Sequence, residues 1–242
     1  MRVTLFNFSS AAVASSAASD AGAPGGGRSD TLAATLTPPL ASGPSATDAR
    51  KALRKMLRAK RRAATPEVRA KAARQVARNV DRVFRLRPGL RVAIYASFPE
   101  ELDSAPLIRL ARKRGCRIFL PRIDTRTISI KFVEATVGAH ETVNHLGIVE
   151  PKGTKPIAAR WLDLVLLPLV GFDAQGMRLG MGGGYYDRTF AYKRRHSAWR
   201  RPRLVGVAYS FQQVPSIGRE WHDVPLDAVV TELGVIRCST GS

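Results

Sequence analysis

Five glycines, an arginine and an aspartate lie close together between residues 176 and 187. The segment reads Gly176-Met-Arg-Leu-Gly-Met-Gly-Gly-Gly-Tyr-Tyr-Asp187, with Arg178 inside it and Asp187 at its end. Glycine permits positive φ angles and lets the backbone approach a ligand closely, and successive N–H groups in such a turn can surround an anion. These residue types therefore suit the binding of a phosphate or another anion.

The elements that would position this loop are a strand before it and a helix after it. The apolar run Leu164 to Leu167 ends at Pro168 and predicts a buried strand, and residues 185–190 are expected to enter a helix. Open α/β proteins bind phosphate at such a strand–turn–helix junction. The dinucleotide pattern G-x-G-x-x-G fails at Tyr185, and no Gly-Lys-Ser/Thr of a P-loop occurs. Composition alone leaves an anion site and a purely structural turn as equal alternatives.

A second positioning unit precedes the loop in the chain. Residues 91–97 predict a strand, Ser104 is expected to cap a helix that ends at Gly115, and residues 116–120 predict a strand stopped by Pro121. This βαβ unit implies a parallel sheet with a right-handed crossover. Ligands of such sheets bind beyond the carboxyl ends of the strands. Phe98, Glu101 and Asp103 lie at one of those ends.

The chain begins its regular structure with two basic helices. Residues 50–62 contain eight Lys or Arg and no acid, and Thr65-Pro66 starts a second helix that runs to about Phe84. The basic helix could bind nucleic-acid phosphates or a small polyanion such as ATP, or it could simply be a solvated face. Phe84 is the only aromatic residue between Asp48 and Leu90, which disfavours a platform that stacks single-stranded bases.

The remaining predicted elements contain fewer candidate functional residues. Residues 128–133 alternate as a strand with Ile128, Ile130 and Phe132 on one face, residues 204–209 predict a buried strand, and residues 228–232 predict a short final strand. His140 and His145 lie in a polar connection without a zinc-binding pattern, so solvated side chains are expected there. The basic cluster from Lys193 to Arg203 is expected on the solvated surface.

Composition bounds the class of protein. The 242 residues carry 39 Lys and Arg against 19 Asp and Glu, a net charge of +20 that points to anionic substrates or partners. The two cysteines, Cys116 and Cys238, form no metal or disulfide pattern and favour a reducing compartment, and no apolar run is long enough to predict a transmembrane helix. Residues 1–47 are rich in Ala, Ser, Gly, Thr and Pro, so we expect a disordered extension. An organelle transit peptide is the weaker alternative, because only Arg2 and Arg28 supply positive charge.

The order of residues in the glycine loop is more specific than its composition. Arg178-Leu-Gly-Met-Gly-Gly-Gly-Tyr-Tyr-Asp187 resembles the signature of the 5-formyltetrahydrofolate cyclo-ligase (5,10-methenyltetrahydrofolate synthetase) family. The loop from Phe98 to Asp103 and the segment His222-Asp-Val-Pro-Leu-Asp-Ala-Val-Val-Thr-Glu232 resemble further family motifs in the right order. The resemblance covers roughly residues 50–237.

The resemblance implies an enzyme that uses ATP and Mg²⁺ to cyclise 5-formyltetrahydrofolate to 5,10-methenyltetrahydrofolate, with release of ADP and phosphate. It implies catalytic roles for Arg178 and Tyr185, and Mg²⁺ ligands at Asp187 and Asp227, which carry the hard oxygen donors that Mg²⁺ prefers. By the same resemblance, the implied ATP-binding residues are Arg50, Lys51, Arg54, Arg178, Leu179, Gly180, Met181, Gly182, Gly183, Gly184, Tyr185 and Tyr186. The implied folate-binding residues are Phe98, Asp103, Gly182, Gly183, Gly184 and Tyr185.

The chain departs from the family pattern inside the loop. Many members have basic residues where this chain has Met181 and Gly183, so contacts from those side chains to phosphate are lost. We predict one α/β domain over residues 48–238, with a mainly parallel sheet of Rossmann-like layering and a basic N-terminal helical pair. We expect a cytoplasmic monomer that acts on small molecules, without a membrane or an obligatory nucleic acid. The alternatives are a basic nucleic-acid-binding protein, which the charge favours, and a nucleotide-binding homologue without this activity.

Overall fold

The computed structural model describes residues 46–135, 141–143, 149–151, 155–195 and 201–238. Two helices open this part of the chain, α1 over Ala46–Ala63 and α2 over Pro66–Phe84. The start of α2 is as the sequence predicts, because the Thr65 hydroxyl accepts a hydrogen bond from the N–H of Val68 and Pro66 lies in the first turn. α1 includes Ala46 and Thr47, which the sequence assigned to the N-terminal extension.

A central sheet has the strand order β11-β10-β9-β6-β1-β2-β3. The neighbours from β10 through β2 pair in parallel, whereas β11 and β3 pair antiparallel at the two edges. The mainly parallel α/β sheet predicted from the sequence is therefore confirmed. Its strands are β1 (Arg91–Ile94), β2 (Arg117–Asp124), β3 (Ser129–Glu134), β6 (Leu164–Pro168), β9 (Arg203–Val207), β10 (Ala228–Thr231) and β11 (Gly234–Arg237).

Shorter elements complete the described chain. The helices are α3 (Ala105–Lys113), α4 (Tyr185–Thr189) and α5 (Tyr192–Arg195), with single 3₁₀ turns at Ala159–Trp161 and Ser210–Gln212. Two antiparallel pairs lie outside the central sheet: β4 (Glu141–Val143) with β5 (Val149–Pro151), and β7 (Gly171–Phe172) with β8 (Arg178–Leu179). The pair β7–β8 leads directly into the glycine loop.

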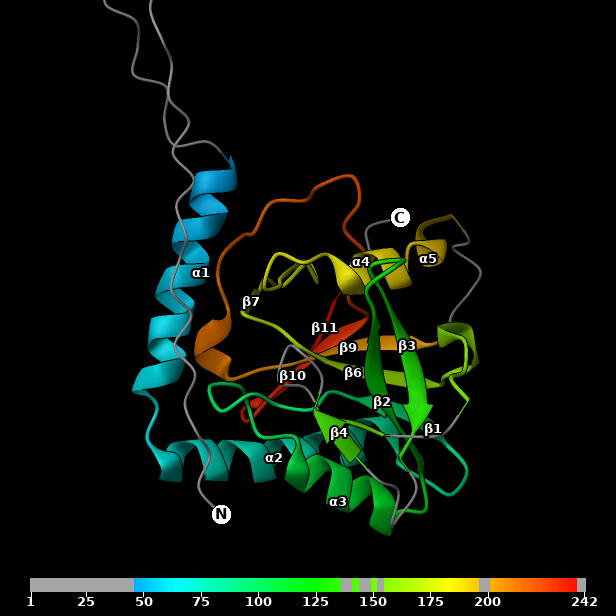
Figure 1. Cartoon of the computed structure of the whole chain (residues 1–242). Coiled ribbons are helices and arrows are strands. Elements are labelled where there is room, and N and C mark those ends of the chain that lie inside the picture. The colour runs from blue at the N-terminus through cyan, green and yellow to red at the C-terminus, as the bar shows by residue number, and fades with distance from the viewer. Residues whose placement is uncertain (1–45, 136–140, 144–148, 152–154, 196–200, 239–242) are drawn as a thin grey trace, which may run out of the picture. The chain divides into compact units, whose positions relative to one another are not determined.

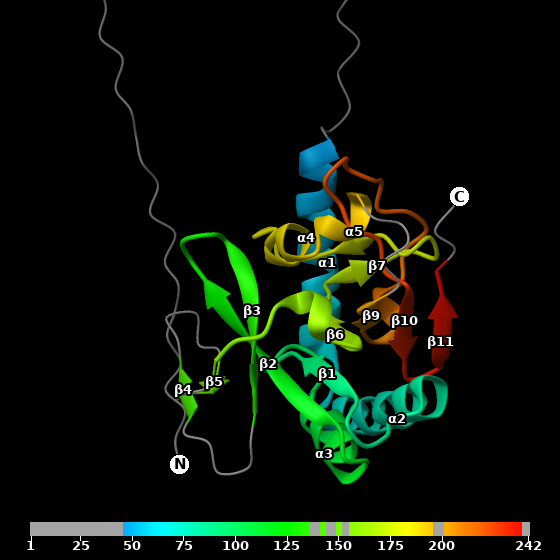
Figure 2. The same cartoon turned by 90° about the vertical axis from the view of Figure 1, so that its right-hand side faces the viewer.

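Helices cover both faces of the central sheet. α2 and α3 lie against one face, and α4 and α5 lie against the other (Figures 1 and 2). The side chains of β6 alternate accordingly: Leu164 and Leu166 pack in the core shared with α2 and α3, whereas Val165 and Leu167 pack in the core that contains Phe190 at the end of α4. Two cores, one on each face, hold the sheet between the helices.

The order of the strands reverses between β1 and β6. From β1 the chain crosses through α3 to β2 on one side, and it later returns to β6 on the other side of β1. In open α/β sheets the ligand crevice lies at this switch point, beyond the carboxyl ends of the two strands. The segments that follow those ends here are the loop at residues 95–104, after β1, and residues 169–184, after β6. This edge is where the fold itself indicates a site.

The structure corrects two strand boundaries. β2 continues through Pro121 to Asp124, although the sequence predicted that Pro121 would stop it. The proline is tolerated because β1 pairs with β2 only as far as Phe119, so the missing N–H breaks no bond to β1. Ile128 does not join the buried face of β3, since it has a φ of 48° and is 43% exposed in the turn that precedes the strand.

Two further expectations are corrected at chain turns. Ser104 precedes α3 without a side-chain capping bond, and the Asp103 carboxylate instead accepts a hydrogen bond from the N–H of Ala105 at 2.9 Å. β10 is not the final strand, because the chain turns at Leu233 and returns as β11. His140 and His145 lie outside the described residues. None of the helices in the described ranges is long and apolar enough to cross a membrane.

Candidate active site

The glycine loop and the loop after β1 meet the basic helix α1 at the carboxyl edge of the sheet. The Arg54 side chain of α1 donates from Nε to the carbonyl of Gly180 at 2.9 Å, which ties the helix to the loop. Further along α1, Arg58, Arg61 and Arg62 each lie within 3.4–3.8 Å of the Glu100 carboxylate, in the loop after β1. α1 thus spans the switch point and contacts the segments that follow both β1 and β6.

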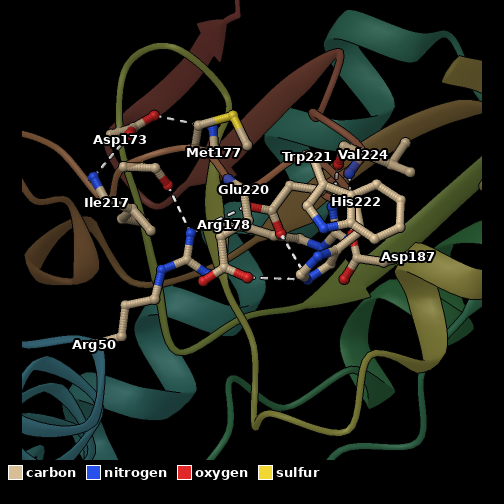
Figure 3. Close-up of polar contacts among 12 residues, drawn as sticks. Arg50, Asp173, Met177, Arg178, Asp187, Ile217, Glu220, Trp221, His222 and Val224 are labelled. Carbon is tan, nitrogen blue, oxygen red and sulfur yellow. Dashed lines mark hydrogen bonds and ion pairs between the residues drawn. The ribbon is translucent and has the colours of Figure 1, made fainter. Parts of the chain in front are cut away.

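Arg178 is buried and holds Asp187 in place. Its guanidinium donates to the Asp187 carboxylate at 2.6 Å and to the carbonyl of Val224, and its side chain is 7% exposed (Figure 3). The same Asp187 oxygen accepts the N–H of Val224 at 3.1 Å. The sequence placed Arg178 among the residues that donate to phosphate, but in this arrangement its donors serve a carboxylate and a carbonyl. Its position is that of a buried support for the loop.

Backbone groups line the exposed part of the glycine loop. Gly182 and Gly184 have positive φ angles, 101° and 64°, and Gly184 immediately precedes α4. Met181 is 60% exposed, and a Cβ added to Gly183 would lie 2.8 Å from the ring of Tyr185. Tyr185 therefore lies over the loop, where the sequence placed it. Leu179 is buried at the end of β8 and anchors the loop to the apolar cluster below it.

Tyr186, another predicted ATP-binding residue, packs toward the core. Its ring stacks on Phe190 with centroids 6.4 Å apart and an interplanar angle of 11°. Burial raises the pKa of the Tyr186 hydroxyl well above its ordinary value, so this group stays protonated at neutral pH. Tyr186 therefore contributes mainly to fixing α4 beneath the loop.

The loop conformation gives a matched pair of glycine substitutions. We expect Gly182→Ala to lower activity about tenfold, because a φ of 101° strains any residue with a Cβ and a cost of roughly 1–3 kcal/mol favours a different loop shape. Gly180→Ala should retain nearly full activity, since the backbone of Gly180 needs no positive φ and its Cβ would meet no atom within 4 Å. Steady-state kinetics of both variants test this, and equal losses in the two would contradict it.

The N-terminal part of α1 is held by carboxylates. Arg50 donates to the carbonyl of Gly218 at 2.7 Å and lies 3.1 Å from Asp223 and 3.0 Å from Glu220 (Figure 3). Lys51 is exposed on the neighbouring face of the helix. The sequence grouped Arg50 and Arg54 as one pair of phosphate donors. The structure brings Arg54 to the glycine loop, whereas Arg50 pairs with two acids and a carbonyl at residues 218–223.

A strap over residues 217–227 runs between α1 and the glycine loop, and Asp173 fixes its start. The buried Asp173 carboxylate accepts hydrogen bonds from the N–H groups of Gln175 and Met177 with one oxygen and from Ile217 with the other, at 2.9–3.1 Å. Figure 3 shows this contact beside the Arg50 and Arg178 pairs. One buried acid thereby joins the β7–β8 turn to the strap.

The loop after β1 carries the predicted folate contacts. Phe98 is 41% exposed, as a residue that packs on a flat ligand should be, and Asp103 is exposed while it caps α3. Glu101, between them, is buried at 9% exposure and accepts a hydrogen bond from the N–H of Phe98 at 3.2 Å. Burial raises the pKa of the Glu101 carboxyl, and the backbone N–H of Phe98 and the charge of Arg61 offset this only in part.

This shift predicts a pH-dependent stability. An acid whose folded-state pKa is raised binds more protons in the folded state, so the free energy of unfolding falls as pH rises through the window between its ordinary and raised pKa values. Glu101→Gln should therefore be more stable than the unmodified protein at pH 7 and lose less stability on going from pH 4 to pH 7. Urea unfolding at both pH values checks this, and a larger loss in the variant would contradict the sign.

The structure does not place the two predicted metal ligands in one contact network. Asp187 is held by Arg178 and Val224, whereas the Asp227 carboxylate accepts the N–H of Leu204 at 2.6 Å and lies 3.8 Å from the Lys193 ammonium. Lys193 is thus partly buried against the fold, although the sequence expected a solvated cluster. Among the described residues, no group of three or more His, Cys, Asp or Glu side chains could hold a metal ion.

Comparison with known proteins identifies the architecture. A family model described as the 5-formyltetrahydrofolate cyclo-ligase family matches residues 46–232, most of the chain. The chain belongs to this family of ligases. The resemblance predicted from the glycine loop is therefore confirmed.

Individual members of the cyclo-ligase family match over nearly their whole length. The 5-formyltetrahydrofolate cyclo-ligase of Escherichia coli K12 is 35% identical over 181 residues, which cover 73% of this chain and 96% of that protein. The protein of the same name from Haemophilus influenzae is 32% identical, over 64% of this chain and 82% of its own. The solved structure of Aquifex aeolicus 5,10-methenyltetrahydrofolate synthetase matches with a TM-score of 0.68 and 30% identity. The match covers 80% of this chain and 94% of that one.

The sequence analysis of this cyclo-ligase family member did not select three residues that support the candidate site in the structure: Asp173, Asp223 and Val224. Asp223 and Val224 lie inside the closing motif at residues 222–232, and only the last aspartate of its Asp-x-x-x-Asp pattern was selected. Asp173 directly follows Phe172 at the end of β7. The sequence does not show whether a carboxylate at such a position is buried or solvated. Its burial depends on the strap 44 residues further on.

Proposed function

We propose that this protein cyclises 5-formyltetrahydrofolate to 5,10-methenyltetrahydrofolate at the expense of ATP, with the site at the carboxyl edge of β1 and β6. The observation that carries the proposal is the bond from Arg54 to Gly180. It joins the two segments that the sequence assigned to ATP, 126 residues apart, at the switch point of the sheet. Their junction lies where α/β sheets bind ligands.

The chemistry divides between the two substrates. The formyl oxygen attacks the γ-phosphorus of ATP, the bond to the β-phosphate oxygen breaks, and ADP leaves. Nitrogen 10 of the folate then attacks the activated formyl carbon and loses its proton, and departure of phosphate leaves the methenyl bridge. Phosphoryl transfer needs positioning and neutralisation of charge more than a protein nucleophile. The proposal assigns those tasks to Arg50, Arg54 and the loop N–H groups of residues 180–184.

The remaining residues position the reactants. Arg54 uses one of its five N–H donors for Gly180, so others are available to a phosphate beside the loop. Phe98 and Tyr185 offer rings to a flat substrate from opposite loops, and Asp103 offers a carboxylate at the start of α3. Arg178 acts through Asp187, and Leu179 and Tyr186 act through packing. Lys51 and Met181 are proposed as outer contacts of the nucleotide.

Mg²⁺ fits Asp187 better than Asp227 in this arrangement. One Asp187 oxygen bonds Arg178 and Val224, and the other makes neither of these contacts, so it can take a cation at the end of the glycine loop. Asp227 is bound to Leu204 and lies close to Lys193, a cation that competes with a metal. Bound Mg²⁺ would neutralise phosphate charge and keep waters as its other ligands. Asp227 remains the proposed second ligand through water.

The absorbance of the conjugated product in the near ultraviolet tests the proposal. Purified protein with 5-formyltetrahydrofolate should form the product only when ATP and Mg²⁺ are both present. Arg54→Ala should raise the KM for ATP about tenfold, because a charge-assisted contact contributes roughly 1.5–3 kcal/mol. Arg74→Ala, at an exposed arginine of α2, should leave the kinetics unchanged. Turnover without ATP, or none with it, would refute the proposed reaction.

The cellular setting is a separate proposal. We propose a cytoplasmic monomer over residues 48–238, because the cysteines carry no disulfide framework and the site is built from one chain. Residues 1–45 lie outside the described part of the chain, so their predicted disorder stays a prediction. Cell fractionation and size-exclusion chromatography with light scattering test both points.

A further inference from the structure

A pocket lies at the opposite edge of the sheet from the glycine loop. It has a volume of about 470 Å³ and is lined by Arg87, Pro88, Gly89, Leu90, Arg91, Arg117, Asp163 and Arg201. Leu90 precedes β1 and Arg91 begins it, Arg117 begins β2, and Asp163 and Arg201 precede β6 and β9. The pocket therefore lies at the amino edge of four neighbouring parallel strands. The strands separate it from the carboxyl edge by about 15 Å, at about 3.3 Å per residue.

Four arginines from three segments of the chain line this pocket: Arg87 and Arg91, Arg117, and Arg201. Asp163 holds two of them: it accepts from the backbone N–H of Arg91 at 2.9 Å and its Nε at 3.5 Å, and from Arg201 at 2.7 Å with its other oxygen. Glu134 lies outside the lining and holds Arg117 through two bonds of 2.7 Å. These contacts hold three of the four guanidinium groups and use only some of their N–H donors.

The charges of the pocket do not balance. Among the described lining residues four arginines face one aspartate, and including Glu134 still leaves two positive charges in excess. Arg87 is exposed at the rim. Fixed arginines in excess over acids are the usual donors for phosphate, because the planar guanidinium presents paired N–H groups to its oxygens.

The lining also limits the class of ligand. Among the described residues it contains no aromatic side chain on which a base could stack, so a single-strand platform is disfavoured. Its volume of about 470 Å³ lies in the range of small-molecule sites. A compact anion with several phosphate groups fits both properties.

We propose that this arginine pocket is a second anion site, distinct from the glycine loop, that binds a compact polyphosphate. Such a site would account for part of the high net positive charge, since the cyclisation does not require the arginines of this pocket. Occupancy would join β1, β2, β6 and β9 at their amino ends through one ligand. The site does not depend on the proposed catalytic activity.

Calorimetric titration with inorganic tripolyphosphate tests the proposal. The unmodified protein should show two classes of sites, because tripolyphosphate also suits the glycine loop. Arg87→Glu should weaken one class at least tenfold and leave the other class and the cyclisation rate unchanged. Arg54→Ala should weaken the other class. Arg74→Glu, the same charge change on the exposed face of α2, is the matched control and should alter neither class.

Two outcomes would overturn the proposal. If Arg74→Glu and Arg87→Glu weaken binding equally, the anion responds to diffuse net charge and not to the pocket. If a labelled single-stranded RNA of twelve nucleotides displaces tripolyphosphate from the Arg87-dependent class and binds more tightly, the ligand is a nucleic acid and not a compact anion. Arg201→Gln, which removes a different pocket charge, should reproduce the effect of Arg87→Glu and so excludes a local folding artefact.

Discussion

Asp187→Ala is expected to abolish turnover, with kcat/KM reduced roughly 100- to 1000-fold, the usual loss when one preorganised electrostatic group is removed from a reaction centre. Two effects combine. The proposed Mg²⁺ ligand is lost, and the buried Arg178 loses its 2.6 Å partner. An uncompensated buried charge typically costs about 3–5 kcal/mol, so the loop at residues 180–184 should also lose its fixed shape.

Asp187→Asn separates these effects. An asparagine keeps an oxygen for the N–H of Val224 and for Arg178 but removes the charge that a metal needs. We expect the Asn variant to unfold at a urea concentration closer to that of the unmodified protein than the Ala variant does, and still to be nearly inactive. An active Asn variant would show that Asp187 only supports the loop, and would remove it from the proposed metal site.

Asp173→Ala is expected to be strongly destabilising, at about 3–5 kcal/mol in the free energy of unfolding. The Asp173 carboxylate is 1% exposed and accepts three backbone N–H groups, which the Ala variant would leave buried without an acceptor. The β7–β8 turn and the strap would then separate. Urea unfolding at pH 7 measures the loss.

Two comparisons sharpen the Asp173 prediction. Asp173→Asn should cost less than Ala, because its oxygen can still serve Gln175 and Met177 while its amide faces the N–H of Ile217. Asp103→Ala removes one exposed capping bond and should cost only about 1 kcal/mol. If Asp173→Ala proved as mild as Asp103→Ala, burial of the carboxylate would not determine the stability of the strap.

The sequence predicts the elements whose signals are local. Thr65 and Pro66 specify where α2 starts, and the apolar run at Leu164 specifies β6, because caps and buried strands depend on neighbouring residues. Pro121 was misleading because a strand N–H donates to only one neighbouring strand, so a proline stops a strand only where that neighbour needs the bond. The pairing with β3 is not visible in the sequence. The αL conformation of Ile128 is likewise set by the hairpin between β2 and β3.

The sequence predicts where the glycine loop lies in the fold but not which side chains contact it. The glycine loop and Phe98 lie at the carboxyl edge as expected, because the order of strands and loops places them there, whereas Arg54 reaches the loop from α1. The role of Arg178 was not predictable, since its partners are Asp187 and a carbonyl 46 residues away. The pairing of Arg50 with Asp223 spans 173 residues and follows only from the docking of α1.

Few buried apolar contacts hold α1 against the rest of the described chain. The only fully buried apolar side chain of this helix within the described residues is Leu57, which packs with Val170, Met177, Leu179 and Ile217. All four partners belong to the hairpin and the strap that form the site, and none belongs to the central sheet. Local unfolding of α1 is therefore a separate event of lower free energy than global unfolding.

Ligand occupancy and the opening of α1 are in consequence one linked equilibrium. A ligand that contacts both Arg54 and the glycine loop binds only the closed form, so it stabilises the docked helix by RT ln(1 + [L]/Kd), about 2.7 kcal/mol at 100 times Kd. We therefore expect the helix that contacts the glycine loop to be the part of the described chain that opens to admit the ligand. Affinity for that ligand and the exchange of α1 amides with solvent must therefore change together.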